Sequence, residues 1–159
     1  MDENVFYRNN RMSIRLEHCI DRYDTFEEFE KQFDDEFLNA DNQVGDYLRD
    51  LLFKYDKKAS KVSLEAGQSA GYVGNIINGV KNNPKRDVLI CICFAIGTTF
   101  DEVQYLLKYA GHAPLYVRNK RDVIIWFGIM KKESLDVVCD NLKERICSSV
   151  CREVNYYWQ

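Results

Sequence analysis

Proline and long apolar runs are scarce in this sequence of 159 residues. Pro84 and Pro114 are the two prolines, so helices can run long elsewhere. The longest apolar run, from Val88 to Gly97, is too short to span a bilayer. The first ten residues are acidic, whereas a signal peptide begins with basic residues followed by apolar ones. We therefore expect a cytoplasmic protein.

The sequence also has few residues of the kinds that build metal sites. It contains two histidines and six cysteines, and none of the cysteines form a CxxC pair. In a cytoplasmic protein, cysteines within apolar helical patterns favour buried thiols over a disulfide framework. Zinc binding is the alternative, because Cys147 and Cys151 are four residues apart on one helix face. We expect no metal and no cofactor.

Motifs of common enzymes are absent as well. There is no Gly-rich phosphate loop, no Gly-x-Ser-x-Gly elbow and no His-Glu-x-x-His. His18 and His112 have no sequence neighbours that complete a metal or nucleophile site. The sequence therefore predicts a protein that is not an enzyme.

Basic residues are outnumbered overall but not locally. The net charge is −3, which by itself argues against a nucleic-acid partner. Residues 1–43 carry 5 basic and 12 acidic groups, residues 44–132 carry 14 and 8, and residues 133–159 carry 3 and 5. The basic excess is therefore confined to the central segment.

The acidic N-terminal segment is expected to form a helical hairpin. Apolar residues recur at roughly helical spacing from Met12 to Tyr23, and Thr25 with Glu28 forms a capping-box signature. The second helix then carries four phenylalanines at helical spacing: Phe26, Phe29, Phe33 and Phe37. The acids between them form a solvated face, or alternatively the hairpin docks on a basic surface or forms a dimer interface.

Capping residues predict further helices along the chain. Asp41 or Asn42 is expected to begin a helix that ends near Tyr55, and Thr98 or Thr99 to begin another. The segment from Val88 to Ile96 has almost no polar face. We therefore expect an all-α fold with this segment as its central helix.

Residues 59–78, ASKVSLEAGQSAGYVGNIIN, have the pattern of two short helices joined at Gly67. Four apolar residues are expected to face inward: Val62, Ala66, Val73 and Ile76. Six small or polar residues are expected to face outward: Ser69, Ala70, Gly71, Gly74, Asn75 and Asn78. Ser69 is expected to cap the second helix. This is helix-turn-helix geometry.

The sequence after this motif contains a repeat with an offset of 35 residues. Residues 86–90 (RDVLI) correspond to residues 121–125 (RDVII), and Phe100-Asp101 corresponds to Leu135-Asp136. Each Arg-Asp pair is interpreted as a helix start, with the acid near the positive end of the helix. The repeat predicts a second helical hairpin packed on the first.

On these residues the chain resembles the phage-repressor-like (lambda repressor, XRE) helix-turn-helix family of bacteria and their mobile elements. The resemblance implies an all-α fold with a five-helix core and a transcription regulator that binds double-stranded DNA as a homodimer. It divides the chain into an acidic helical extension (1–42), a helix-turn-helix domain (43–112) and a C-terminal helical hairpin packed on the core (113–159).

In such a protein the second helix of the motif enters the major groove. The residues then expected near base edges are Ser69, Ala70, Gly71, Tyr72, Gly74, Asn75 and Asn78. Those expected to contact phosphates are Lys57, Lys58, Lys61, Lys81, Lys85 and Arg86. Of the first group, Asn75 is the one suited to a bidentate adenine contact.

Alternatives remain for several of these segments. The scaffold is alternatively a protein-binding module, such as a mobile-element inhibitor or adaptor, that keeps the helix-turn-helix as structure. Arg118, Lys120 and Arg121 either extend a DNA footprint or begin a helix near Asn119. The aromatic residues at 156–158 are expected to dock on the body of the protein or on a partner.

Overall fold

The computed structural model describes residues 15–37 and 42–146, and in these two ranges helices are joined by turns and loops, with no strand. The chain divides into two compact units, residues 1–41 and residues 42–159. The all-α fold expected from the apolar periodicity is confirmed. No helix in the described ranges is long and apolar enough to cross a membrane.

The first unit is built around a small aromatic cluster. Residues 15–19 are helical, followed by η1 (Ile20–Arg22), α2 (Phe26–Phe33) and η2 (Asp34–Glu36). The Thr25 hydroxyl accepts a hydrogen bond from the Glu28 amide, as its position in the sequence predicts. Rings of Tyr23, Phe29 and Phe33 meet at centroid distances of 4.9–5.8 Å.

The predicted stripe of four phenylalanines is only half buried. Phe29 and Phe33 lie in the aromatic cluster, whereas Phe26 is 63% exposed and Phe37 is 44% exposed. The α-helix stops at Phe33 because the chain continues into the 3-10 turn of η2, which changes the residue spacing. The expected helix start near Met12 lies outside the described residues.

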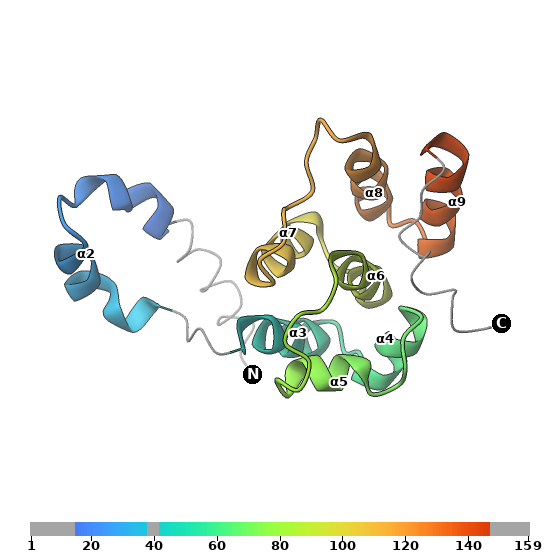
Figure 1. The fold of residues 1–159 in the computed structure, drawn as a ribbon, viewed down its shortest axis with the longest axis horizontal. Helices are drawn as coiled ribbons and strands as arrows, with labels where there is room; N and C mark the ends of the chain where they lie inside the picture. Colours follow the sequence, from blue (N-terminus) through green and yellow to red (C-terminus); the bar gives the residue numbers. More distant parts are fainter. Residues whose placement is uncertain (1–14, 38–41, 147–159) are drawn as a thin grey trace. The chain divides into compact units, whose positions relative to one another are not determined.

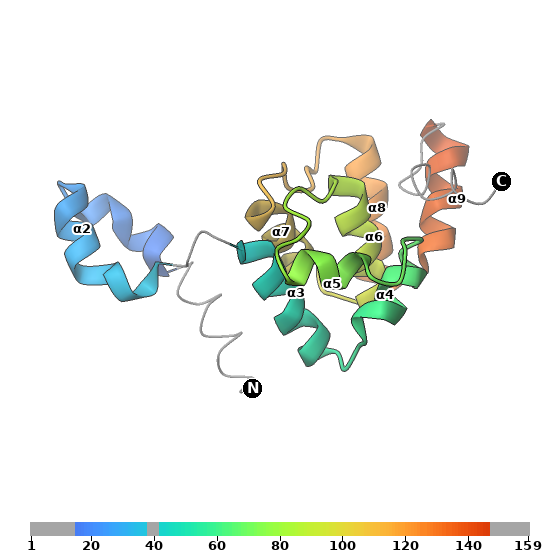
Figure 2. The same ribbon diagram turned by 60° about the horizontal axis from the view of Figure 1, so that its bottom comes forward.

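The second unit contains seven helices in its described part, residues 42–146: α3 (Gln43–Lys54), α4 (Ala59–Glu65), α5 (Tyr72–Ile77), α6 (Arg86–Ile96), α7 (Phe100–Tyr109), α8 (Lys120–Lys131) and α9 (Leu135–Ile146). Figures 1 and 2 show α6 at the centre, with α3, α4 and α5 on one side of it and α8 and α9 on the other. Residues 88–93 of α6 are all buried, which confirms that the segment without a polar face is the central helix.

A buried carboxylate joins α3 to α7. Glu102 is 2% exposed, and its oxygens accept hydrogen bonds from the Lys54 ammonium, the Tyr55 hydroxyl and the Thr99 amide. Thr99 in turn accepts a bond from the Glu102 amide, so Thr99 rather than Thr98 is the cap of α7. Burying this charge is tolerated because its acceptor positions are filled.

The cysteines follow the thiol prediction only in part. Cys91 and Cys93 are buried in α6 and form no disulfide, and burial raises the pKa of Cys93 to about 12. Cys139, in contrast, is disulfide-bonded, so the expectation of a buried thiol is wrong for this residue. Cys147 and Cys151, the pair considered for zinc, lie outside the described residues.

Candidate nucleic-acid interface

Helices α4 and α5 are joined by a turn in which Gly67 has a φ of 72°. A positive φ is accessible to glycine without a steric penalty, so this residue permits the reversal between the helices. The four residues expected to face inward, Val62, Ala66, Val73 and Ile76, are at most 1% exposed. Contacts to α3 and α6 hold the pair against the rest of the unit.

A hydroxyl connects the two helices through the buried side of the turn. The Ser63 hydroxyl donates to the Ala59 carbonyl at 2.7 Å and accepts from the Val73 amide at 3.0 Å. Ser63 has 0% exposure, so its hydroxyl needs partners within the protein, and it has them. The amide of Val73 lies in the first turn of α5, where helix amides have no partner within the helix.

Ser69 does not cap α5, contrary to the sequence prediction. The cap residue is Gly71, which has no side chain that could accept a bond from the first turn. Residues 69–71 instead form a turn before the helix, in which the Ser69 carbonyl accepts from the Tyr72 amide at 3.0 Å. The helix therefore begins two residues later than a cap at Ser69 would place it, and it is short.

The outward side of the α5 region is made of small residues. Ser69, Ala70, Gly71, Asn75 and Asn78 are exposed, and Gly74 and Tyr72 are partly exposed. A Cβ added at Gly71 or Gly74 would meet nothing within 4 Å. Internal packing therefore does not require glycine at either position, although glycine lowers helix stability.

Asn42 fixes the end of α5. Its side-chain carbonyl caps α3 by accepting from the Gly45 amide, while its side-chain amide donates to the Ile76 carbonyl at 3.3 Å and the Ile77 carbonyl at 2.8 Å. The sequence offered Asn42 for the first role, with Asp41 as the alternative cap. The second role connects Asn42 to residues that lie 34 and 35 positions further along the chain, and no local sequence signal indicates it.

Five of the predicted phosphate ligands are lysines at or near this surface. Lys58, Lys61, Lys81 and Lys85 are exposed and Lys57 is partly exposed. Lys61 lies 3.8 Å from Glu65, an exposed pair that holds it weakly. The Lys81 ammonium lies 5.1 Å from the centroid of the Tyr72 ring, so Tyr72 supports a cation at the edge of α5.

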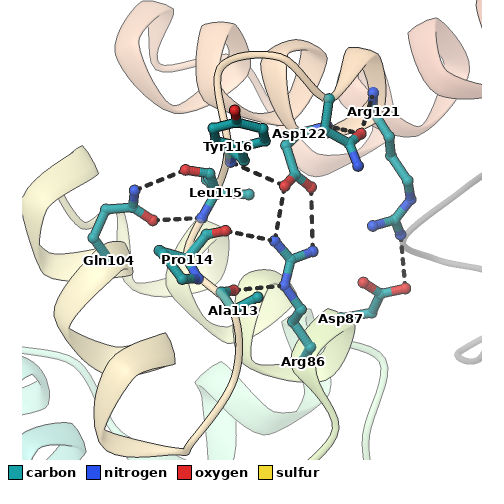
Figure 3. Close-up of polar contacts among 10 residues, drawn as sticks. Arg86, Asp87, Gln104, Ala113, Pro114, Leu115, Tyr116, Arg121 and Asp122 are labelled. Atoms are coloured by element: carbon teal, nitrogen blue, oxygen red, sulfur yellow. Dashed lines mark hydrogen bonds and ion pairs between the residues drawn. The ribbon is translucent and has the colours of Figure 1, made fainter.

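Arg86, the sixth predicted phosphate ligand, is occupied by internal partners. Its guanidinium contacts both carboxylate oxygens of Asp122 at 3.0 and 3.2 Å (Figure 3). It also donates to the carbonyls of Ala113 at 2.9 Å and Pro114 at 3.3 Å. A phosphate would have to compete with this bidentate pair, so we do not expect Arg86 to contact DNA.

The two Arg-Asp pairs of the 35-residue repeat bind each other crosswise. Arg86 at the start of α6 pairs with Asp122 of α8, and Arg121 of α8 pairs with Asp87 of α6 at 2.7 Å (Figure 3). Asn119 caps α8 by accepting from the amides of Arg121 and Asp122. Of the second basic cluster, Arg121 therefore has a structural role, whereas Arg118 and Lys120 are exposed.

The surface around α5 thus offers short polar side chains, backbone groups and lysine ammonium groups. Within residues 15–37 and 42–146, no three His, Cys, Asp or Glu side chains come together in a way that could hold a metal ion. Comparisons with protein-family models, with curated protein sequences and with solved structures found no match to this chain.

Proposed function

We propose that this protein is a DNA-binding transcription regulator that acts as a dimer. In this proposal α4 and α5 are a phage-repressor-like helix-turn-helix within a five-helix core of α3 to α7. Helix α5 enters the major groove of double-stranded DNA, and α4 lies across it. The observation that carries the proposal is the pairing of α4 and α5 about Gly67, with a fully buried inner side and lysines around the outer side.

The outer side of α5 favours close approach of a large partner. Short side chains at residues 69–71 and the open space at Gly71 and Gly74 let a duplex come near the backbone of the helix. In this arrangement Asn75 is the residue placed to read an adenine edge, with Ser69, Ala70, Tyr72 and Asn78 beside it. Because α5 presents few long polar side chains, we expect the protein to discriminate only modestly between DNA sequences.

The lysines supply the larger share of affinity in this proposal. Lys57, Lys58 and Lys61 precede or lie on α4, and Lys81 and Lys85 follow α5. Ammonium groups on both sides of a helix contact the phosphates that border a groove, and they release counterions from DNA. Such contacts position the protein without reading sequence.

The proposal is tested by measuring DNA affinity by fluorescence anisotropy with pooled genomic fragments at several salt concentrations. We expect affinity to fall steeply with salt, and Lys81→Ala to weaken binding to all sequences alike and lower the salt slope by about one. Asn75→Ala should weaken binding only to the preferred sequence. Lys131→Ala is the matched control, because this exposed lysine lies on α8, which packs on α7 and α9. Absence of binding at low salt would refute the proposal.

The second candidate is a protein-binding module that keeps α4 and α5 as a scaffold. Two exposed apolar residues favour it: Leu64 on α4 is 59% exposed and Val80 after α5 is 73% exposed. Large apolar side chains at an interface indicate a protein surface rather than phosphate. If Leu64→Ser abolishes binding to a protein partner and leaves DNA affinity unchanged, this candidate is favoured over DNA recognition.

A further inference from the structure

A groove lies on α8 and α9 at some distance in the sequence from the candidate DNA surface. It has a volume of about 500 Å³ and is lined by residues of α8, of α9 and of the segment before α8. Its apolar part consists of Val117, Val123, Ile124 and Phe127. Val117 is 64% exposed and Phe127 is 58% exposed, which leaves a sizeable apolar surface in contact with water.

The charges of the groove are unevenly distributed. Arg118 and Lys120 lie at the start of α8 and Arg145 lies near the end of α9, while Glu133 lies between the two helices. The three basic residues form no ion pair with any residue in the ranges 15–37 and 42–146. The groove therefore combines an apolar floor with a basic edge that lacks an acidic partner in the described part of the chain.

The first unit of the protein has the complementary properties. Residues 15–37 carry three basic and nine acidic side chains. Within residues 15–37, three large apolar side chains remain exposed: Ile20, Phe26 and Phe37. An acidic helical segment with exposed aromatic groups is the kind of ligand that enters an apolar groove with a basic edge.

We propose that residues 15–37 of a second copy of this chain occupy the α8–α9 groove. Phe26 of that copy contacts Phe127, and carboxylates of its α2 and η2 contact Lys120 and Arg145. Two copies related by a two-fold axis can each place residues 15–37 in the groove of the other. Both grooves are then filled, so the assembly stops at a dimer. The contact does not involve α5 and does not depend on DNA binding.

The apolar floor distinguishes a protein occupant from a nucleic acid. A phosphate backbone in the groove would contact the basic edge but would leave Phe127, Val123 and Ile124 beside charged groups. An acidic segment with aromatic side chains satisfies both parts of the groove. Aromatic residues at the centre of an interface and charged residues at its edge are the usual arrangement in protein complexes.

The first test is sedimentation velocity of the full chain without DNA. We expect a dimer at about 10–100 µM that dissociates as salt is raised, since the charge contribution is screened. Phe127→Ser and Arg145→Glu should each weaken the dimer by about tenfold or more. Met130→Ser is the matched control, because Met130 is 61% exposed on the same helix but does not line the groove. Circular dichroism establishes that each variant is folded.

The second test identifies the contact itself. A mixture of ¹⁵N-labelled and unlabelled full-length protein is treated with a carbodiimide, which joins lysines to carboxylates in direct contact. We expect links between Lys120 of one copy and acids of residues 27–36 of the other, and their loss in Phe127→Ser. A monomer at every concentration, links confined to single copies, or equal effects of Met130→Ser and Phe127→Ser would overturn the proposal. A monomer at every concentration would also remove the dimer from the proposed function, but because DNA is absent, no outcome here bears on whether α5 contacts DNA.

Discussion

One buried hydroxyl, that of Ser63, joins α4 to the first turn of α5. We expect Ser63→Ala to destabilise the protein by about 1–3 kcal/mol, because it leaves the buried Val73 amide without its acceptor. Urea denaturation measures the change, and the exposed Ser60 on the same helix gives the control variant Ser60→Ala. Equal stabilities of the two variants would mean that the Ser63 bond contributes little.

Replacing Gly74, in the middle of α5, is expected to have opposite effects on protein stability and on DNA affinity. Gly74 has open space around its Cα, so Gly74→Ala is expected to stabilise the protein by about 0.5–1 kcal/mol through helix propensity. If a duplex approaches α5 closely, the same methyl group lowers DNA affinity. Thermal unfolding and anisotropy on one variant measure both effects. A stabilised variant with unchanged affinity would place Gly74 away from the duplex.

At the scale of residues, local signals were predictable and distant partners were not. The inward positions Val62 and Ile76 follow from apolar spacing, and the structure buries both. The bonds from Asn42 to the end of α5 and from Arg86 to Asp122 connect residues more than 30 positions apart. Such partners depend on how the helices pack, and one sequence contains no local pattern for them.

At the scale of elements, the 35-residue repeat has a structural role that the sequence alone did not indicate. Each Arg-Asp pair was interpreted as a helix start, in which the acid favours the positive helix end. In the structure the aspartate of each helix, α6 or α8, also forms an ion pair with the arginine of the other helix. The two repeats of the Arg-Asp motif therefore hold the N-terminal ends of α6 and α8 together. Asp122 additionally accepts a bond from the Tyr116 amide.

The two crosswise pairs are expected to differ in strength. Asp122 is nearly buried, so Asp122→Ala leaves the Arg86 guanidinium without its carboxylate and should cost about 3 kcal/mol. Asp87→Ala removes a more exposed pair and should cost about 1 kcal/mol or less. A double-mutant cycle with Arg86→Ala, followed by urea denaturation, measures the coupling. Additive effects of Arg86→Ala and Asp122→Ala would contradict a direct interaction.

Helix boundaries show the same division between local and distant causes. Thr25 is a cap that the sequence indicated, and Asn42 and Thr99 are each one of two neighbouring candidates that it offered, because a cap acts within three residues of its own position. Ser69 satisfied the same pattern but lies in a turn, since α5 begins after the cap residue Gly71, two residues further along the chain. The capping pattern in the sequence therefore identifies candidate caps, and the course of the chain in the folded protein determines which of them are used.

At the scale of the whole molecule, the two units differ in the core that their described residues form. Among residues 15–37, two phenylalanines are buried and Tyr23 is partly covered, whereas residues 42–146 have a continuous core around α6. An isolated unit of this small size gains little from apolar burial. The charge is divided in the same way, with the acidic excess in residues 1–43 and the basic excess in residues 44–132.

Hydrogen exchange connects this division to the proposed contact between copies. In dilute solution we expect α2 amides to exchange about 100-fold or more faster than α6 amides, because a small cluster opens more readily than a central helix. If residues 15–37 of one copy occupy the groove of another, protection of α2 must rise with protein concentration while α6 stays unchanged. Phe127→Ser should abolish that rise, and Met130→Ser should not. Strong protection of α2 at every concentration would mean that contacts within a single chain stabilise the first unit.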